Sequence, residues 1–191
     1  MATIEPAGRP ASPYGDPPFT VDDLLKFPED GNRYELFDGN LLVSSAPTIL
    51  HQVAITNAMH VLLNAAPREL LTLTNVNFRV SDKDYYIPDL VVVPRSAALR
   101  GGLMFSPRDM LLAGEVVSPS TQKQDKSLKA VAYAEAGVPA YWRFELNEGP
   151  TLYVYELNGD SYDPPTAYKA GTTARLTWPF PVRFDPAQLL D

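Results

Sequence analysis

Two carboxylates stand where buried strands usually carry apolar side chains. Asp89 follows Pro88 at the start of the run LVVV, and Glu115 comes just before Val116 and Val117 at the end of another apolar run. A buried acid is costly unless it is paired, and two acids on neighbouring strands repel each other unless a proton or a metal ion intervenes. Carboxylate oxygens with water completing the shell suit Mg²⁺ or Mn²⁺ better than zinc. The sequence therefore predicts a Mg²⁺ (or Mn²⁺) site at Asp89 and Glu115.

Lys129 is the third residue that could do chemistry. It lies four residues after Asp125 and four before Tyr133, so the three side chains share one face of a predicted helix. A lysine beside two metal-binding acids can position a water molecule and stabilise negative charge that develops on a phosphoryl group. The combination indicates hydrolysis of a phosphate ester.

The hydrophobic pattern predicts the elements that position these residues. Helices are expected over residues 21–27, 48–65 and the stretch that Gly137 ends, the last with Leu128, Val131 and Ala132 as its buried stripe. Strands are expected over residues 33–37, 41–45, 70–80, 86–93, 110–117, 138–146, 151–157, 162–168 and 175–184, the last as a proline-broken edge strand. Residues 94–108 have no clear period, and we expect a loop beside the site that either contacts substrate or is a solvated connection.

The order of these elements indicates the fold class and the domain organisation. Helix, three strands, helix and strand over residues 48–146 predict an α/β or α+β domain with a mixed sheet. A chain of 191 residues is long enough for one domain with a good core. We expect a flexible lead-in over residues 1–18 and a single domain over residues 19–191, with an N-terminal hairpin and a C-terminal hairpin around the core.

Composition limits the classes of function. The chain has no cysteine, which excludes disulfides and thiolate metal sites, and it has neither an apolar run that could span a bilayer nor a secretory signal, so we expect a cytoplasmic protein without membrane contact. The net charge of −7 argues against nucleic-acid binding. However, residues 79–129 carry eight basic and six acidic side chains, so the candidate site lies in the least acidic part of the chain.

The motifs that contain these residues resemble a known family. YELFDG, the pair His51-Gln52, PDL and EVVSPSTQKQDKSLKAVAYAEAGVPAYW occur in this order between Tyr34 and Trp142. The set is similar to the PD-(D/E)xK nuclease superfamily and, more narrowly, to the Uma-type family of restriction endonucleases. The resemblance implies a restriction-endonuclease-like fold and a Mg²⁺-dependent endonuclease that acts on DNA, with Asp89, Glu115, Lys129 and Glu35 as site residues.

One position departs from the superfamily pattern. The lysine of that pattern stands two residues after the acid on the same strand, where this chain has Val117. The resemblance to the Uma-type pattern makes Lys129, on the next helix, the natural replacement. Lys126 and Lys123 are weaker substitutes.

Two alternatives to DNA cleavage remain open from the sequence. The acidic net charge and the missing strand lysine favour a catalytically inactive nuclease-like binding or assembly module, in which Asp89 pairs with an arginine such as Arg79 and Glu115 pairs with Lys129. The second alternative is a metal-dependent hydrolase that acts on another phosphate ester. His51 is more often a helix cap or surface residue than a catalyst, and the aromatic C-terminal hairpin could form the surface of a homodimer.

Overall fold

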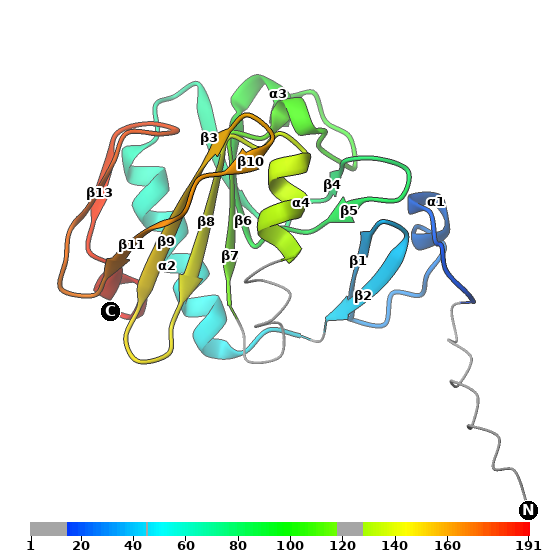
Figure 1. Ribbon diagram of the computed structural model, residues 1–191, viewed down its shortest axis with the longest axis horizontal. Coiled ribbons are helices and arrows are strands. Elements are labelled where there is room, and N and C mark those ends of the chain that lie inside the picture. The colour runs from blue at the N-terminus through cyan, green and yellow to red at the C-terminus, as the bar shows by residue number, and fades with distance from the viewer. Residues whose placement is uncertain (1–14, 45, 118–127) are drawn as a thin grey trace, which may run out of the picture.

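A mixed β-sheet forms the centre of the computed structural model, which describes residues 15–44, 46–117 and 128–191 (Figure 1). Within these residues the strand order is β10-β9-β8-β7-β6-β3, and β11 pairs with the same edge of β9 as β10. Only β7 and β8 are parallel, and α4 (Lys129–Glu135) lies on the connection between them, as a parallel pair requires a crossover. The strands are β3 (Leu70–Thr74), β6 (Leu90–Pro94), β7 (Leu112–Val116), β8 (Ala140–Glu145), β9 (Thr151–Asn158), β10 (Ser161–Tyr162) and β11 (Thr166–Lys169).

Helices cover both faces of this sheet, which explains the continuous apolar runs in the sequence. The side chains of Leu90 and Val92 pack in one core with α2 (Ile49–Ala65), whose first turn is capped by Thr48. The intervening Val91 and Val93 pack in a second core with α4.

A smaller antiparallel sheet packs beside α4. Its order is β2-β1-β5-β4, built from β1 (Arg33–Phe37), β2 (Asn40–Ser44), β4 (Phe78–Arg79) and β5 (Tyr85–Tyr86). Phe37 stacks on Tyr86 with 4.7 Å between the ring centroids, and Tyr86 meets Tyr133 of α4 edge to face at 5.6 Å. These rings fix β1 against the helix that carries Lys129.

The chain passes into and out of the small sheet within two segments that were each expected to form one continuous strand. The predicted strand over residues 70–80 is wrong, because Asn75, with a φ of 51°, separates β3 from β4. The predicted strand over residues 86–93 is divided by Ile87-Pro88-Asp89, since a proline has no N–H for the ladder. Asp89 therefore lies just before β6, at the junction of the two sheets.

The buried stripe predicted for α4 is wrong at two of its three residues. Leu128 and Val131 are 40% and 56% exposed, whereas Ala132 is buried as predicted, together with Lys129 and Tyr133. The helix turns its Lys129–Tyr133 face towards the sheet, as their spacing of four residues allows. Asp125, expected on the same face, lies outside the described residues.

Three further segments differ from the expectation in detail. Residues 94–108 contain α3 (Arg95–Leu99) and lead into the 3₁₀ turn η1 (Pro107–Asp109). The expected strand over residues 175–184 is a separate hairpin, β12 (Ala174–Leu176) with β13 (Val182–Phe184), followed by η3 (Pro186–Leu190). The first helix, α1 (Val21–Leu24), is shorter than expected, although its capping box of Thr20 and Asp23 is present.

The strand expected over residues 162–168 is divided into β10 and β11. The other predicted elements are present with small shifts of their ends, and the mixed α+β fold class is confirmed. The β1–β2 hairpin turns at Asp38-Gly39, α2 spans the predicted helix, and Tyr141 and Trp142 are buried on β8. In the part of the chain that the structure describes, no helix has both the length and the hydropathy needed to cross a membrane.

Two glycines with nearly the same backbone conformation provide a test of the fold. Gly39 has a φ of 71° and Gly137, which ends α4, a φ of 73°. Gly137→Ala is expected to cost about 1 kcal/mol through strain at positive φ. Gly39→Ala should cost more, because its Cβ would lie 2.7 Å from Pro18 Cβ, whereas the added methyl at Gly137 meets open space among the described residues. Urea unfolding of both variants measures the difference, and equal losses would contradict the packing of the N-terminal segment on this turn.

Candidate active site

Asp89 and Glu115 lie at the same end of two neighbouring strands. β6 and β7 are antiparallel, with Leu90 opposite Gly114; Asp89 directly precedes Leu90, and Glu115 directly follows Gly114. The N–H of Val116 donates to Asp89 Oδ2 at 3.0 Å, which fixes the carboxylate against the end of β7.

Both oxygens of Asp89 have further partners from other elements. Oδ1 lies 2.8 Å from Nη1 of Arg33 on β1, and Oδ2 lies 3.0 Å from Nε2 of His51 in the first turn of α2. Burial by itself raises the pKa of this carboxyl, but the hydrogen bond with His51 and the charge of Arg33 outweigh it and hold the pKa well below its usual range. Asp89 is therefore an ionised, buried carboxylate.

Glu115 is held by two residues of α4. Lys129 Nζ lies 2.8 Å from its Oε1, and the Tyr133 hydroxyl donates to the same oxygen at 2.6 Å. Burial, together with the charge of Glu115, raises the pKa of Tyr133 well above its ordinary value, so the phenol stays neutral and remains a donor. One turn of helix thus supplies a charged and a neutral donor to one carboxylate oxygen.

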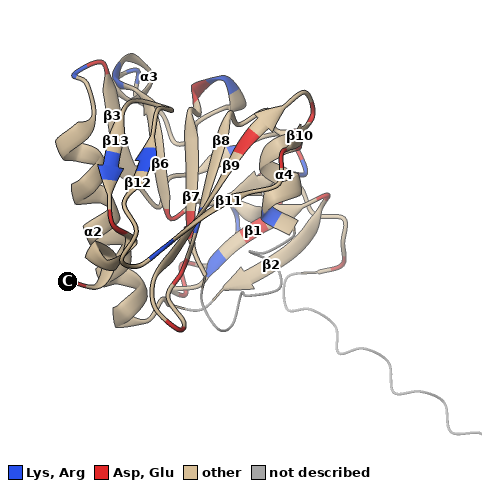
Figure 2. Cartoon of the chain, turned by 60° about the vertical axis from the view of Figure 1, so that its left-hand side comes forward, with Lys and Arg blue, Asp and Glu red and all other residues tan. Residues whose placement is uncertain are grey.

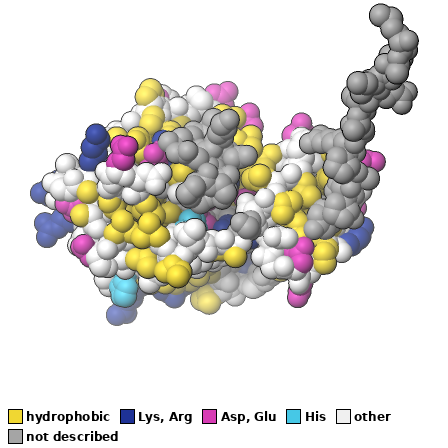
Figure 3. Space-filling model, turned by 90° about the horizontal axis from the view of Figure 1, so that it is seen from below, with side chains coloured by type: hydrophobic (Ala, Val, Ile, Leu, Met, Phe, Trp, Pro, Cys, Tyr) yellow, Lys and Arg dark blue, Asp and Glu magenta, His cyan; other side chains and the backbone are white. Residues whose placement is uncertain are grey.

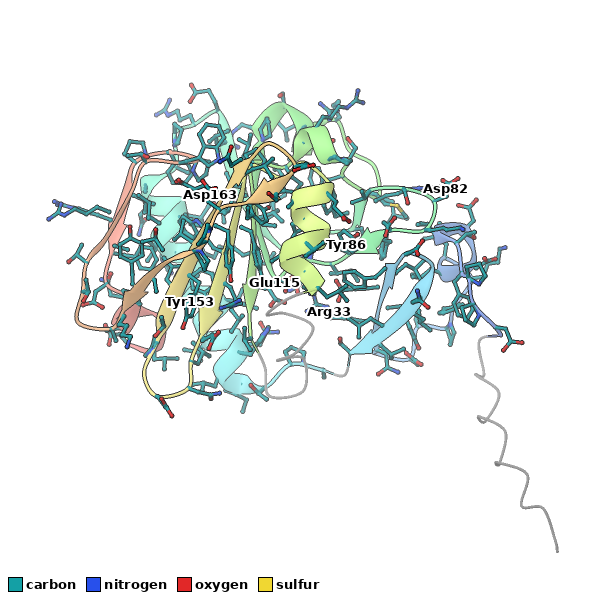
Figure 4. All side chains as sticks on the ribbon, viewed as in Figure 1. Arg33, Asp82, Tyr86, Glu115, Tyr153 and Asp163 are labelled. Carbon is teal, nitrogen blue, oxygen red and sulfur yellow. The ribbon has the colours of Figure 1, made fainter. Side chains whose placement is uncertain are left out.

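Glu35 brings a third carboxylate to the same point. Alternation along β1 places Arg33, Glu35 and Phe37 on one face of the strand. Glu35 Oε1 lies 3.4 Å from Lys129 Nζ and accepts the N–H of Ile87 at 2.9 Å. Figure 4 shows Arg33 and Glu115 near the first turn of α4, and Figure 2 shows acidic and basic segments adjacent on β1 and at the lower end of β7. The lysine therefore bridges acids from both sheets.

The structure brings all four site residues named from the sequence into one cluster. Glu35, Asp89, Glu115 and Lys129 are each buried; Lys129 contacts Glu35 and Glu115 directly, and Asp89 is bonded to the N–H of Val116, the residue after Glu115. Their catalytic role stays a prediction. Lys123 and Lys126, the weaker substitutes for Lys129, lie outside the described residues.

Sequence reasoning missed Arg33 and assigned His51 to the wrong place. His51 was expected at a cap or on the surface, but its side chain is buried against Asp89. Arg79, named as a possible partner of Asp89, pairs with Asp22 and Asp82 instead. Two signals could have found the true partners: Arg33 stands two residues before Glu35, hence on the same face of a strand, and His51 belongs to the quoted HQ pair.

The segment expected to form a loop beside the site lies elsewhere. Asp89 precedes β6, whereas α3 follows the other end of that strand. Five strand residues span roughly 17 Å. Residues 95–108 instead line a cavity of about 480 Å³ with Asn75 and Asn77, so their expected contact with substrate at the carboxylates is wrong.

The donor set fits a hard divalent cation. Among the described residues no group of three or more His, Asp or Glu side chains is arranged to enclose a metal. Mg²⁺, however, is usually bound by one or two carboxylates, with water and substrate phosphate completing its shell. Asp89, directly before β6, and Glu115, on the neighbouring strand β7, could supply such a pair of oxygens. In this structure cationic side chains contact these oxygens: Arg33 contacts Asp89, and Lys129 contacts Glu115. The contact between Glu115 and Lys129 is the one that the ion-pair alternative from the sequence expected.

A double-mutant cycle tests the buried pair of Glu115 and Lys129 without reference to function. Glu115→Gln removes the charge that Lys129 contacts at 2.8 Å, and Lys129→Met removes the amine from Glu115, so each single change should cost about 3 kcal/mol. The double variant should cost clearly less than the sum, with a coupling of roughly 1–3 kcal/mol. Urea unfolding measures all four proteins. Additive losses would contradict the contact between the two side chains.

Comparison with known proteins agrees with this fold. None of the curated proteins with which the chain was compared matches it. A crystal structure titled as a "putative nuclease belonging to DUF820", from Anabaena variabilis ATCC 29413, superposes with a TM-score of 0.74 at 18% identity, covering 91% of this chain and 98% of that one. At that identity the likeness shows the fold alone.

A family model matches most of the chain. The model of the Uma2 family, described as "Putative restriction endonuclease", matches residues 21–187. The match includes every motif on which the resemblance was based, and that resemblance is confirmed. The chain belongs to the Uma2 family.

Proposed function

We propose that this protein is a divalent-metal-dependent endonuclease that hydrolyses phosphodiester bonds of DNA. The observation that carries the proposal is the placement of Asp89 and Glu115 at the same end of the neighbouring strands β6 and β7, with Lys129 Nζ 2.8 Å from the second acid. Two carboxylates and a lysine converging on one point match the parts needed for metal-assisted hydrolysis of a phosphodiester. The family description supports a nuclease, and hence DNA as the substrate class.

Each side chain has a distinct part in this mechanism. Asp89 and Glu115 would hold Mg²⁺ or Mn²⁺, which when bound polarises a phosphate and lowers the pKa of a coordinated water. Lys129 orients the attacking water and offsets the negative charge that grows on the phosphate. Glu35, 3.4 Å from Lys129, fixes the position of the amine, and Tyr133 fixes the carboxylate of Glu115.

A binding or assembly module without catalysis is the second candidate, and one observation favours it. Asp89, Glu115 and Glu35 are each 2% exposed and each already bonded to donors of the protein. A cluster of this kind can be purely structural, because the charges of the acids are balanced largely by Arg33 and Lys129. Metal binding separates the two candidates. The remaining alternative, a hydrolase of small phosphate esters, would act on small phosphodiesters without cleaving DNA.

A nicking assay on supercoiled plasmid tests the proposal. We expect cleavage with Mg²⁺ or Mn²⁺, none with chelator, and a loss of at least about 100-fold in Glu115→Gln, because that variant lacks a charged metal ligand. Glu156→Gln, an exposed change on β9, is the matched control and should retain full activity.

Calorimetric titration of Mg²⁺ completes this test. Wild type should bind the ion and Asp89→Ala should not. Binding that is equal in both proteins, or full activity of Glu115→Gln, would remove the assigned roles. Metal binding in the wild type without cleavage of any DNA would leave the binding module as the function.

We propose a homodimer for the same activity, because two paired sites can cut both strands of a duplex. The C-terminal hairpin was the expected surface, but Tyr155 and Tyr162 pack inward on Tyr141. Exposed apolar side chains gather instead at the start of α2 and on β2, on the side seen from below in Figure 3: Val43, Ile49, Leu50 and Val53. Sedimentation equilibrium should therefore show a dimer that Ile49→Lys converts to monomer. A wild-type monomer at high concentration would contradict this proposal.

A further inference from the structure

Arg33 is the member of the cluster that reaches solvent. Its side chain is 23% exposed, whereas those of Asp89 and Lys129 are 3% and 5% exposed. Nη1 binds Asp89 Oδ1 at 2.8 Å, and Nη2 donates to the carbonyl oxygen of Ile87. Its Nε is buried without a hydrogen-bond partner among the described residues. The guanidinium therefore lies between the buried acids and the open side of the site.

Arg33 occupies the oxygen that a metal ion would need. Asp89 Oδ2 already accepts from the N–H of Val116 and contacts His51, which leaves Oδ1 as the oxygen for an incoming cation. Arg33 binds Oδ1, and two cations at one oxygen repel each other. A divalent ion at Asp89 thus competes with the guanidinium of Arg33.

The charge of the cluster indicates where the displaced guanidinium goes. The carboxylates of Glu35, Asp89 and Glu115 contact the cationic side chains of Arg33 and Lys129. A divalent ion bound at these acids would add positive charge to the cluster, and the negative charge of a phosphodiester would offset it. Arg33 is more exposed than Lys129, so it is the cation that can meet the phosphate.

We propose that Arg33 is the phosphate-binding residue of the site. It holds Asp89 Oδ1 while no divalent ion is bound, and the ion displaces it towards a phosphate of the DNA backbone. The planar fork of a guanidinium matches two phosphate oxygens, as it matches the Asp89 carboxylate and the Ile87 carbonyl here. The inference rests on the proposed function, since it needs both the metal site and the DNA substrate.

Calorimetry with Mg²⁺ tests the competition between Arg33 and the metal ion. The proteins are wild type, Arg33→Met, Arg33→Lys and the matched control Arg79→Met, which removes an arginine of the same small sheet that pairs with Asp22 and Asp82. Arg33→Met should bind Mg²⁺ about tenfold more tightly than wild type, Arg33→Lys should be intermediate, and Arg79→Met should equal wild type. Arg33→Lys keeps the charge, so it serves if the methionine variant fails to fold.

Fluorescence anisotropy with a phosphorothioate duplex, which resists hydrolysis, tests the contact with phosphate. Mg²⁺ should tighten duplex binding by wild type more than by either Arg33 variant. In the presence of Mg²⁺, the slope of log K against log salt should fall by about 1 in Arg33→Met. If Arg33 were only structural, Arg33→Met would neither bind Mg²⁺ more tightly than wild type nor have a smaller salt slope.

The outcomes separate this inference from the proposed function. No binding of Mg²⁺ by wild type would overturn both. Binding of Mg²⁺ by wild type that Arg33→Met and Arg33→Lys leave unchanged or weaken would overturn the displacement alone. Tighter binding of the metal with an unchanged salt slope would overturn the contact between Arg33 and phosphate.

Discussion

Three carboxylates buried at one point are the constraint on which the rest of the structure depends. Glu35, Asp89 and Glu115 come from both sheets, and none of them is stable in a dry interior without a nearby cation or donor. The fold supplies these partners from separate elements: Arg33 from β1, His51 from α2, and Lys129 and Tyr133 from α4. The orientation of α4 follows from this requirement, because its Lys129–Tyr133 face turns inward while Val131 stays exposed.

Local signals were sufficient for much of the fold. The turn at Asp38-Gly39, the capping of α2 by Thr48 and the end of α4 at Gly137 depend on residues close in sequence, whose conformational preferences are strong. That the segments carrying Asp89 and Glu115 lie close together was also predictable, since each acid interrupts an apolar run. It needed only the assumption that the two runs are neighbours, which the register of β6 and β7 bears out.

The failures have a common physical cause, which is competition from tertiary contacts. Hydrophobic periodicity predicted Val131 on the buried face of α4. A buried ion pair and a buried tyrosine hydroxyl, however, determine which face of this seven-residue helix is turned towards the sheet. Arg33 was missed because its partner, Asp89, is 56 residues away, and the local signal for it was only its position two residues before Glu35. Likewise, the strand expected over residues 70–80 is split between two sheets, a choice that its composition does not record.

The short link Ile87-Pro88-Asp89 joins the two sheets and touches both halves of the site. Ile87 offers its N–H to Glu35 and its carbonyl oxygen to Arg33, while Asp89, two residues later, is anchored to Val116 on the central sheet. Proline between them has a fixed φ, so the link has little freedom to absorb movement. A small rotation of one sheet against the other would therefore alter the spacing of the acids directly. The aromatic contact of Phe37 with Tyr86, although it carries no charge, therefore helps to set the spacing of the buried acids.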